Sequence, residues 1–173
     1  FYKYKFLKVI DLIVQMKTNE LESSGSFKEN MLKKNADSNK IIPTYCLLSK
    51  TAKIGKKCFE KCKKLLKIAI PNNISTIGEY SFSGCKSLEE IIIPNSVKFI
   101  ENNAFFDCSS LKKITIPSSV TSIGHHAFEK CTSLKQIFIP DSVTEIGDGA
   151  FNGCLSLSKI SISSSTTIFG DKI

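Results

Sequence analysis

The chain has 173 residues, of which 42% are hydrophobic, so one folded domain with a buried core is expected. Its formal charge of +8 comes from lysine alone, because the sequence contains no arginine. No run of eighteen apolar residues occurs, which excludes a transmembrane helix on hydropathy grounds. Without arginine forks or interleaved aromatic residues, nucleic acid is the least favoured partner.

Residues 1–47 are expected to form an N-terminal cap or linker. The apolar positions between Phe6 and Met16 follow helical spacing, which predicts an amphipathic capping helix. The polar stretch 18–40 predicts a loop or linker, and Ile41-Ile42-Pro43 resembles an irregular first coil. The chain begins with Phe rather than Met, so an upstream secretion signal remains an open alternative.

A 23-residue unit repeats through most of the chain, and prolines mark it at positions 71, 94, 117 and 140. The repeats predict five coils, 48–70, 71–93, 94–116, 117–139 and 140–162, followed by a partial sixth coil or C-terminal cap at 163–173. Two columns stand out: Phe59, Phe82, Phe105, Phe128 and Phe151, and Cys62, Cys85, Cys108, Cys131 and Cys154. Because one coil cannot bury its own apolar face, the columns predict a solenoid whose stacked coils share a core.

Each column predicts a local structure. The segment Leu-x-x-Ile-x-Ile predicts a strand with one buried face, and the proline after it ends the pairing at a corner. Val-x-x-Ile predicts a second, shorter extended stretch, and the glycine that follows in most coils is expected to turn the chain. From glycine to cysteine a short helical or turn segment is expected, with its phenylalanine inside the stack. Phe128→Ala should lower the free energy of unfolding by about 3–5 kcal/mol, and the same change in the last coil should lower it by less.

The cysteines do not predict a metal site or a disulfide framework. Five of the seven lie in one column, where a thiol packs as a small apolar group with a weak donor. Zinc needs four converging ligands, whereas this column spreads the thiols along the solenoid axis. Cys46 lies outside the column, and Cys58 takes the place of alanine in its coil. The sequence therefore predicts no metal ion, and the cysteines do not fix the compartment.

No catalytic arrangement is visible in the sequence. His125-His126 falls at a turn whose other copies are variable, so both histidines are interpreted as surface residues. There is no glycine-rich phosphate loop, nucleophile elbow or metal-spaced set of His and Glu. The chain is therefore expected to be non-enzymatic and to need no cofactor. One glycosylation sequon, Asn73-Ile74-Ser75, would matter only in a secreted protein.

The repeat L-x-x-I-x-I-P-x-x-V-x-x-I-G-x-x-A-F-x-x-C resembles the BspA-like leucine-rich repeats over residues 48–162. This resemblance implies a right-handed curved solenoid, an α/β superhelix that is rich in β-strand and has short helical turns. It also implies adhesion to host matrix proteins or contact between cells, as a secreted or surface-displayed protein. An intracellular scaffold for protein–protein interaction is the alternative, with a cytoplasmic location. The ligand, the oligomeric state and the extent of the full protein stay open.

The residues that the repeat does not determine form two candidate binding surfaces. The first consists of the outward positions of the longer strands, which alternation assigns to Lys67, Glu90, Ile92, Lys113, Thr115, Gln136, Phe138, Lys159 and Ser161. Packing against a cap or a neighbour is the alternative role for the apolar pair Ile92 and Phe138. The second is a basic patch that would bind an acidic glycan or lipid, formed by Lys50, Lys53, Lys56, Lys57, Lys61, Lys63 and Lys64. A solvated rim without a ligand is the alternative there.

Overall fold

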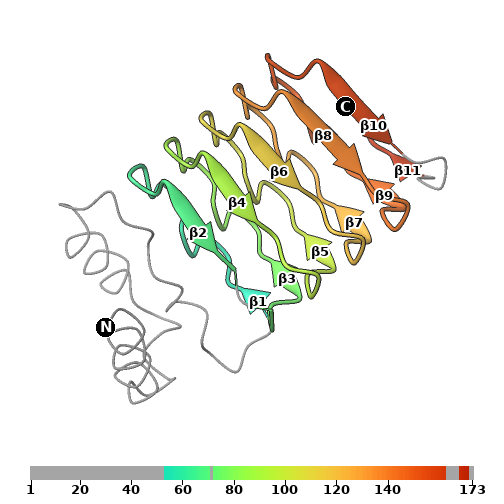
Figure 1. The fold of residues 1–173 in the computed structure, drawn as a ribbon, viewed down its shortest axis with the longest axis horizontal. Helices are drawn as coiled ribbons and strands as arrows, with labels where there is room; N and C mark the ends of the chain where they lie inside the picture. The colour runs from blue at the N-terminus through green and yellow to red at the C-terminus, as the bar shows by residue number, and fades with distance from the viewer. Residues whose placement is uncertain (1–52, 71, 163–167, 172–173) are drawn as a thin grey trace, which may run out of the picture.

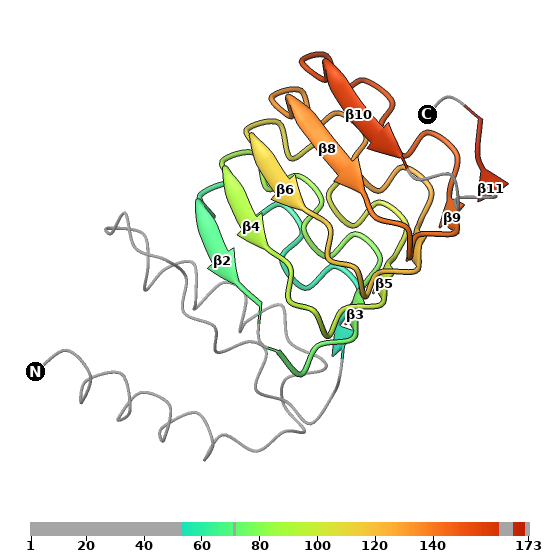
Figure 2. The ribbon, with the colours of Figure 1, turned by 45° about the vertical axis from the view of Figure 1, so that its right-hand side comes forward.

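The computed structural model describes residues 53–70, 72–162 and 168–171. Within these residues the chain winds into a stack of coils in which each strand pairs in parallel with an equivalent strand of an adjacent coil (Figures 1 and 2). The expected cap at 1–47 lies outside the described residues, as do Lys50 and Cys46. The predicted solenoid with a 23-residue period is confirmed.

Each coil contributes two strands that meet near the proline corner. The longer strands are β2 (Lys67–Ala69), β4 (Glu90–Ile92), β6 (Lys113–Thr115), β8 (Gln136–Ile139) and β10 (Lys159–Ile162). The shorter ones are β1 (Lys53–Ile54), β3 (Thr76–Ile77), β5 (Phe99–Ile100), β7 (Ser122–Ile123), β9 (Glu145–Ile146) and β11 (Ile168–Phe169). The short strands form one six-stranded sheet, and the longer strands form a row of three and a row of two. Below, the longer strands are called the first face and the six-stranded sheet the second face.

The pairing keeps equivalent residues exactly one coil apart. Ile91 pairs with Ile114 on the first face, and Ile100 pairs with Ile123 on the second. β6 illustrates the alternation, since Ile114 is buried whereas Lys113 and Thr115 on either side of it are exposed. The one-sided strands that the sequence predicts are therefore present in β4, β6 and β8, whereas in β10 Ile160 is exposed and Ser161 is half-buried.

The core is made of columns rather than of scattered contacts. Phe82, Phe105 and Phe128 are fully buried, and their rings lie parallel with centroids 5.3 Å apart in both neighbouring pairs. The Leu and Ile columns are buried beside them as far as the coil 117–139, whereas in the last coil Leu157 and Ile162 are partly buried and Ile160 is exposed. Each large side chain is thus covered mainly by its own equivalents in the adjacent coils, which explains why the residue identities repeat.

The segment between the second strand and the cysteine contains no helix in the part of the chain that the structure describes. It is a succession of turns, in which Ala104 donates to the carbonyl of Glu101 and Cys108 donates to that of Phe105. Asn103 and Asp107 have φ values of 56° and 55°, and a left-handed residue interrupts a right-handed helical run. The helical alternative for this segment was wrong, and the turn alternative is correct.

The repeated glycine has a different role from the expected one. Gly124 and Gly147 do not have positive φ, so they are not there for a left-handed turn. A Cβ atom at Gly124 would lie 2.6 Å from the backbone nitrogen of Asn102 in the preceding coil. At Gly124, glycine avoids this contact between the backbones of successive coils, whereas Glu101 occupies the same position one coil earlier.

Candidate binding surfaces

The first face presents its outward side chains in two columns, because parallel pairing aligns the same position of each coil. Lys67, Glu90 and Lys113 align in one column, and Gln136 aligns with Lys159. The second column includes Ile92 beside Thr115, and Phe138 beside Ser161. The structure thus places the nine predicted residues of this surface along one series of strands (Figure 1).

Two large apolar side chains of this face are exposed to solvent. Ile92 has 68% of its surface exposed and Phe138 has 63%. Both belong to the second column, with Thr115 on the strand between theirs. Beside Ile92, residues from β4 and β6, including Glu90, Lys113 and Thr115, line a shallow hollow of about 300 Å³. The face therefore combines apolar anchors with polar neighbours.

Charges on the first face are partly paired. The Lys67 ammonium lies 3.6 Å from the carboxylate of Glu90, and both side chains are about half exposed. Such exposed pairs contribute only about 0–1 kcal/mol to stability. Among the described residues, Lys113 and Lys159 form no ion pair. Their ammonium groups are available to a partner.

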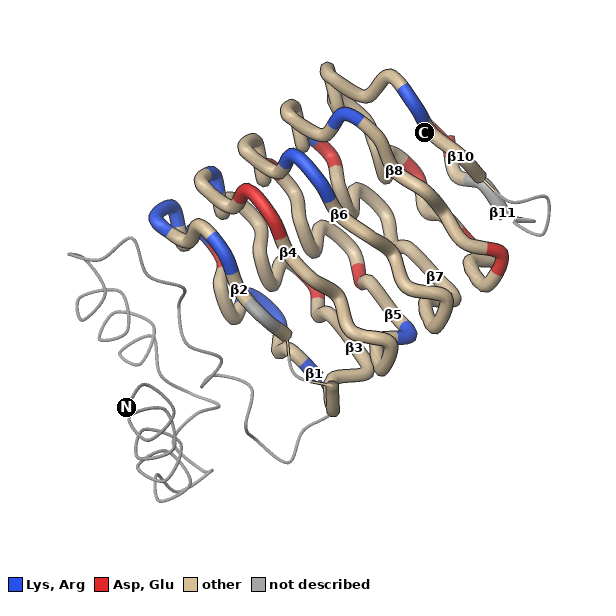
Figure 3. The backbone as a smooth tube through the Cα atoms, viewed as in Figure 1, with Lys and Arg blue, Asp and Glu red and all other residues tan. Residues whose placement is uncertain are grey.

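The predicted basic patch is less basic than the sequence suggests, because acids of neighbouring coils neutralise part of it (Figure 3). Lys53 pairs with Glu101 at 2.6 Å, and Lys56 pairs with Glu79 at 2.7 Å. The hydrogen bond to Glu79 is the main reason why the pKa of Lys56 is raised. Lys57 lies 3.9 Å from Glu60 and also approaches the ring of Tyr80.

Three lysines of the patch keep their charge unpaired within the described chain. Lys61, Lys63 and Lys64 are exposed on the turn that precedes β2, and no described acid lies within ion-pair distance of them. The cationic surface is therefore the cluster of these three residues rather than the whole predicted patch.

The cysteine column is buried and hydrogen-bonded. The Sγ atoms of Cys85, Cys108 and Cys131 donate to the carbonyls of Phe59, Phe82 and Phe105, each one coil earlier, at 3.1–3.3 Å. Burial raises the pKa of the Cys108 thiol to about 12 and that of Cys131 well above its usual range. Thiols held neutral in this way are poor nucleophiles and poor metal ligands. Among the described residues, no group of three or more His, Cys, Asp and Glu could hold a metal ion.

Comparisons with known proteins agree with this architecture. A family model described as the BspA type leucine rich repeat region matches residues 52–173 in six copies. A leucine-rich repeat protein from Bacteroides ovatus is 41% identical, with a TM-score of 0.65 over 69% of this chain and 31% of that one. The chain belongs to the BspA-type leucine-rich repeat family.

Two further structures of repeat proteins resemble this BspA-type chain. A leucine rich cell surface protein from Faecalibacterium prausnitzii is 33% identical, with a TM-score of 0.62 over 68% of this chain and 31% of that one. The pneumococcal vaccine antigen PcpA is 26% identical, with a TM-score of 0.62 over 73% of this chain and 31% of that one. The chain thus spans 31% of the length of each. No curated protein matches it.

The family and its structural relatives make this chain a repeat module for protein interaction. No helix among the described residues is long and apolar enough to span a bilayer. Neither finding identifies a partner. The class of partner is therefore inferred from the side chains exposed on the two faces.

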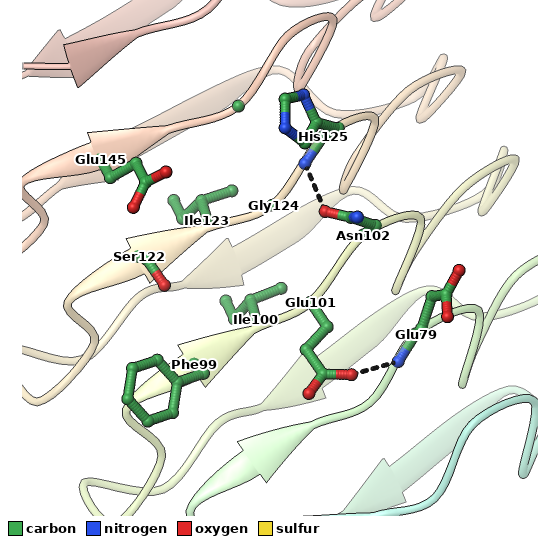
Figure 4. Close-up of a pocket in the computed structure, with 11 residues that line it drawn as sticks. Glu79, Phe99, Ile100, Glu101, Asn102, Ser122, Ile123, Gly124, His125 and Glu145 are labelled. Atoms are coloured by element: carbon green, nitrogen blue, oxygen red, sulfur yellow. Dashed lines mark hydrogen bonds between the residues drawn. The ribbon is translucent and has the colours of Figure 1, made fainter.

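The second face of this BspA-type repeat also carries aligned outward residues, which the sequence pattern does not single out. Phe99, Ser122 and Glu145 align one coil apart on β5, β7 and β9. Together with the turn residues Asn102 and His125, they line a hollow of about 430 Å³ (Figure 4). These residues each precede or follow the buried Ile column by one or two positions, and this offset is the signal that could have revealed them.

His125 has a structural role that its interpretation as a variable surface residue missed. Its Nδ1 atom accepts a hydrogen bond of 3.0 Å from the backbone N–H of Asp148. One coil earlier, Asn102 Oδ1 accepts the backbone N–H of His125 at 2.9 Å. One coil later, Asp148 Oδ1 accepts that of Asp171. This position therefore links successive coils through its side chain, and His, Asn and Asp all provide the acceptor.

Proposed function

We propose that this chain is a non-enzymatic adhesion module, secreted or displayed on a cell surface, that binds a protein partner through the first face. The observation that carries the proposal is the exposure of Ile92 and Phe138 at equivalent outward positions of β4 and β8 on the first face. Aromatic and large aliphatic side chains that are exposed before binding are typical anchors of protein interfaces.

The surroundings of these anchors fit a protein ligand. Polar Thr115 and Ser161 lie beside the two apolar side chains, and the uncompensated Lys113 and Lys159 occupy the neighbouring column. An apolar centre with a polar rim is the usual composition of such interfaces. The hydrogen bonds of the stack hold the backbone of this face in place before binding, so little backbone entropy is lost when the partner docks.

Substitutions on the face test the binding site. In Ile92→Thr/Phe138→Thr, both anchors become the residue that position 115 already carries. We expect affinity for a protein ligand, found in a panel of purified extracellular matrix proteins by surface plasmon resonance, to fall about tenfold or more. The matched control is Leu155→Thr, because Leu155 is 85% exposed but lies in a turn outside the face. Equal loss in the control, or no matrix ligand at all, contradicts the proposal.

Localisation tests the adhesion role separately. The named relatives include a cell surface protein and a vaccine antigen, which supports display outside the cell. Antibodies against the coils should label intact cells that express the full-length gene. Labelling only after permeabilisation would favour the intracellular scaffold instead.

A second candidate function is the binding of an acidic glycan or lipid by Lys61, Lys63 and Lys64. The observation that favours it is their exposure without an acidic neighbour among the described residues. Retention on heparin should fall steeply with salt and be lost in Lys61→Gln/Lys63→Gln/Lys64→Gln. The control Lys98→Gln/Lys135→Gln/Lys159→Gln removes the same charge elsewhere and should be retained like the parent. Equal retention of both triple variants contradicts a specific patch.

A further inference from the structure

The hollow on the second face is a separate, shallow site that is open to solvent, and it is distinct from the anchors of the first face. It is lined by residues of four successive coils and takes its outer wall from Phe99, Ser122 and Glu145. Its volume of about 430 Å³ lies within the range of ligand pockets, about 300–1,000 Å³. Figure 4 shows Asn102 and His125 on the opposite wall, with the short strands β5 and β7 between the two walls.

The hollow is open where two coils keep the glycine of the repeat and is closed where the coil before them departs from it. Gly124 and Gly147 line it and add no side chain, so the space above the backbone stays open. The equivalent position one coil earlier is Glu101, whose carboxylate accepts the backbone N–H of Glu79 at 2.9 Å. The Glu101 side chain therefore closes one end of the hollow, as Figure 4 shows.

The lining is electrostatically one-sided. It contains three carboxylates, from Glu79, Glu101 and Glu145, and no lysine. Lys56 and Lys53 neutralise the first two from outside the hollow. Glu145 forms no ion pair with a described residue and is exposed. The remaining negative charge thus lies at the end opposite Glu101.

An exposed aromatic ring shares the wall with this free carboxylate. The Phe99 side chain is 44% exposed, and Ser122 separates it from Glu145 along the column. Successive coils are about 4.7–4.9 Å apart, so Phe99 and Glu145 are separated by roughly 9–10 Å. A long cationic side chain can lay its methylene stem on the ring and bring its charged head to the carboxylate.

We propose that this hollow binds an arginine or lysine side chain from a basic segment of a partner protein. The stem packs on Phe99, the Ser122 hydroxyl accepts a hydrogen bond from the head group, and Glu145 supplies the opposite charge. Charge complementarity carries the choice of occupant, since the lining offers a free anion and no cation. This contact is independent of Ile92 and Phe138, so the two faces can engage a partner separately.

The test uses the full chain, labelled with ¹⁵N, and a short glycine peptide with one central arginine. The matched peptide carries citrulline, which has the same shape and no charge. At millimolar concentrations the arginine peptide should shift the amide resonances of Ser122, Gly124 and Gly147 in a saturable way, whereas the citrulline peptide should not. A lysine peptide should shift the same resonances.

Variants locate the contact. Glu145→Gln should weaken binding about five- to tenfold, since a charge-assisted hydrogen bond is lost. Phe99→Thr, which copies Thr76 of the same column, should weaken it about threefold. The controls Glu90→Gln and Phe138→Thr make the same chemical changes on the first face and should bind like the parent. All four side chains are exposed, so unchanged thermal midpoints verify folding.

Three outcomes overturn the proposal. Equal shifts with the citrulline peptide mean that charge is not recognised. Parent-like binding by Glu145→Gln means that the cation lies elsewhere. Shifts confined to the first face, or none with either basic peptide, mean that the hollow has a different occupant or none. Loss of matrix-protein binding on the first face leaves this result unaffected, so the two proposals fail independently.

Discussion

The Cys108 thiol donates a hydrogen bond of 3.2 Å to the carbonyl oxygen of Phe82, one coil earlier. The same carbonyl also accepts the backbone N–H of Cys85 within its own coil. Cysteine recurs because this buried position needs a small side chain with a donor that reaches the preceding coil. The column is therefore part of the stacking, and it accounts for thiols that would otherwise suggest redox or metal chemistry.

Substitution of Cys108 should separate the hydrogen bond from the packing. Cys108→Ala removes both the donor and the sulfur, and we expect a loss of about 1–2 kcal/mol in the free energy of unfolding. Cys108→Ser keeps a donor at the same place and should lose less. Urea denaturation followed by circular dichroism measures both. If the serine variant is as unstable as the alanine variant, the hydrogen bond contributes nothing.

Alkaline pH should destabilise the stack through the same thiols. Burial raises the pKa of Cys108 to about 12 from a usual 9.0, so the unfolded chain loses its proton at lower pH than the folded one. This group contributes its full stabilisation below about pH 9. As the pH rises from there towards about pH 12, its contribution to the free energy of unfolding falls by about 1.4 kcal/mol per pH unit. Urea midpoints between about pH 8 and pH 10.5 should fall, and Cys108→Ser should show a shallower slope. Identical slopes for parent and variant would assign the effect to other groups.

The repeat made much of the fold predictable from the sequence. Because each buried column is covered by its own equivalents, five copies of Phe and of Cys define interior positions without knowledge of any contact. The outward residues of the first face, such as Ile92 and Phe138, follow from alternation along the longer strands. Their exposure is confirmed, whereas their role in binding remains a prediction.

What the sequence did not predict depends on contacts between unlike positions of different coils. The pair Lys53–Glu101 joins residues 48 positions apart and lowers the charge of the basic patch. The hollow at Phe99 was missed because β5 has only two residues, too few to show alternation. The sequence also does not reveal the close backbone approach at Gly124, because a repeated glycine is equally compatible with a flexible turn.

The phenylalanine stack should be most sensitive in its middle. Phe128 is fully buried between Phe105 and Phe151, with ring centroids 5.3 and 5.5 Å away. Phe128→Ala should therefore cost about 3–5 kcal/mol. Phe151→Ala should cost less, because within the described chain Phe151 stacks on one ring only. Denaturation midpoints of the two variants decide the order, and a larger effect at Phe151 would contradict it.

The glycine column can be tested with one matched pair. In Gly124→Ala the new methyl group would lie 2.5 Å from Asn102 Oδ1 and 2.6 Å from the Asn102 nitrogen, so the coils must separate, at a cost of about 1–3 kcal/mol. At Gly55 no described atom lies within 4 Å of the added Cβ, and Gly55→Ala should be neutral or stabilising by about 0.4–1 kcal/mol. Thermal unfolding measures the contrast. Equal destabilisation would point to a conformational need for glycine at both positions.

The ladder of side-chain acceptors on the second face predicts which replacements His125 tolerates. Its Nδ1 atom accepts the N–H of Asp148, and Asn102 performs the same task one coil earlier. His125→Asn should therefore remain within about 0.5 kcal/mol of the parent, whereas His125→Leu leaves the Asp148 N–H without its side-chain acceptor and should cost about 0.5–1.5 kcal/mol. Hydrogen exchange at the Asp148 amide should speed up in the leucine variant and not in the asparagine variant. If both variants exchange alike, the link between coils does not depend on this acceptor, and the histidine is a surface residue after all.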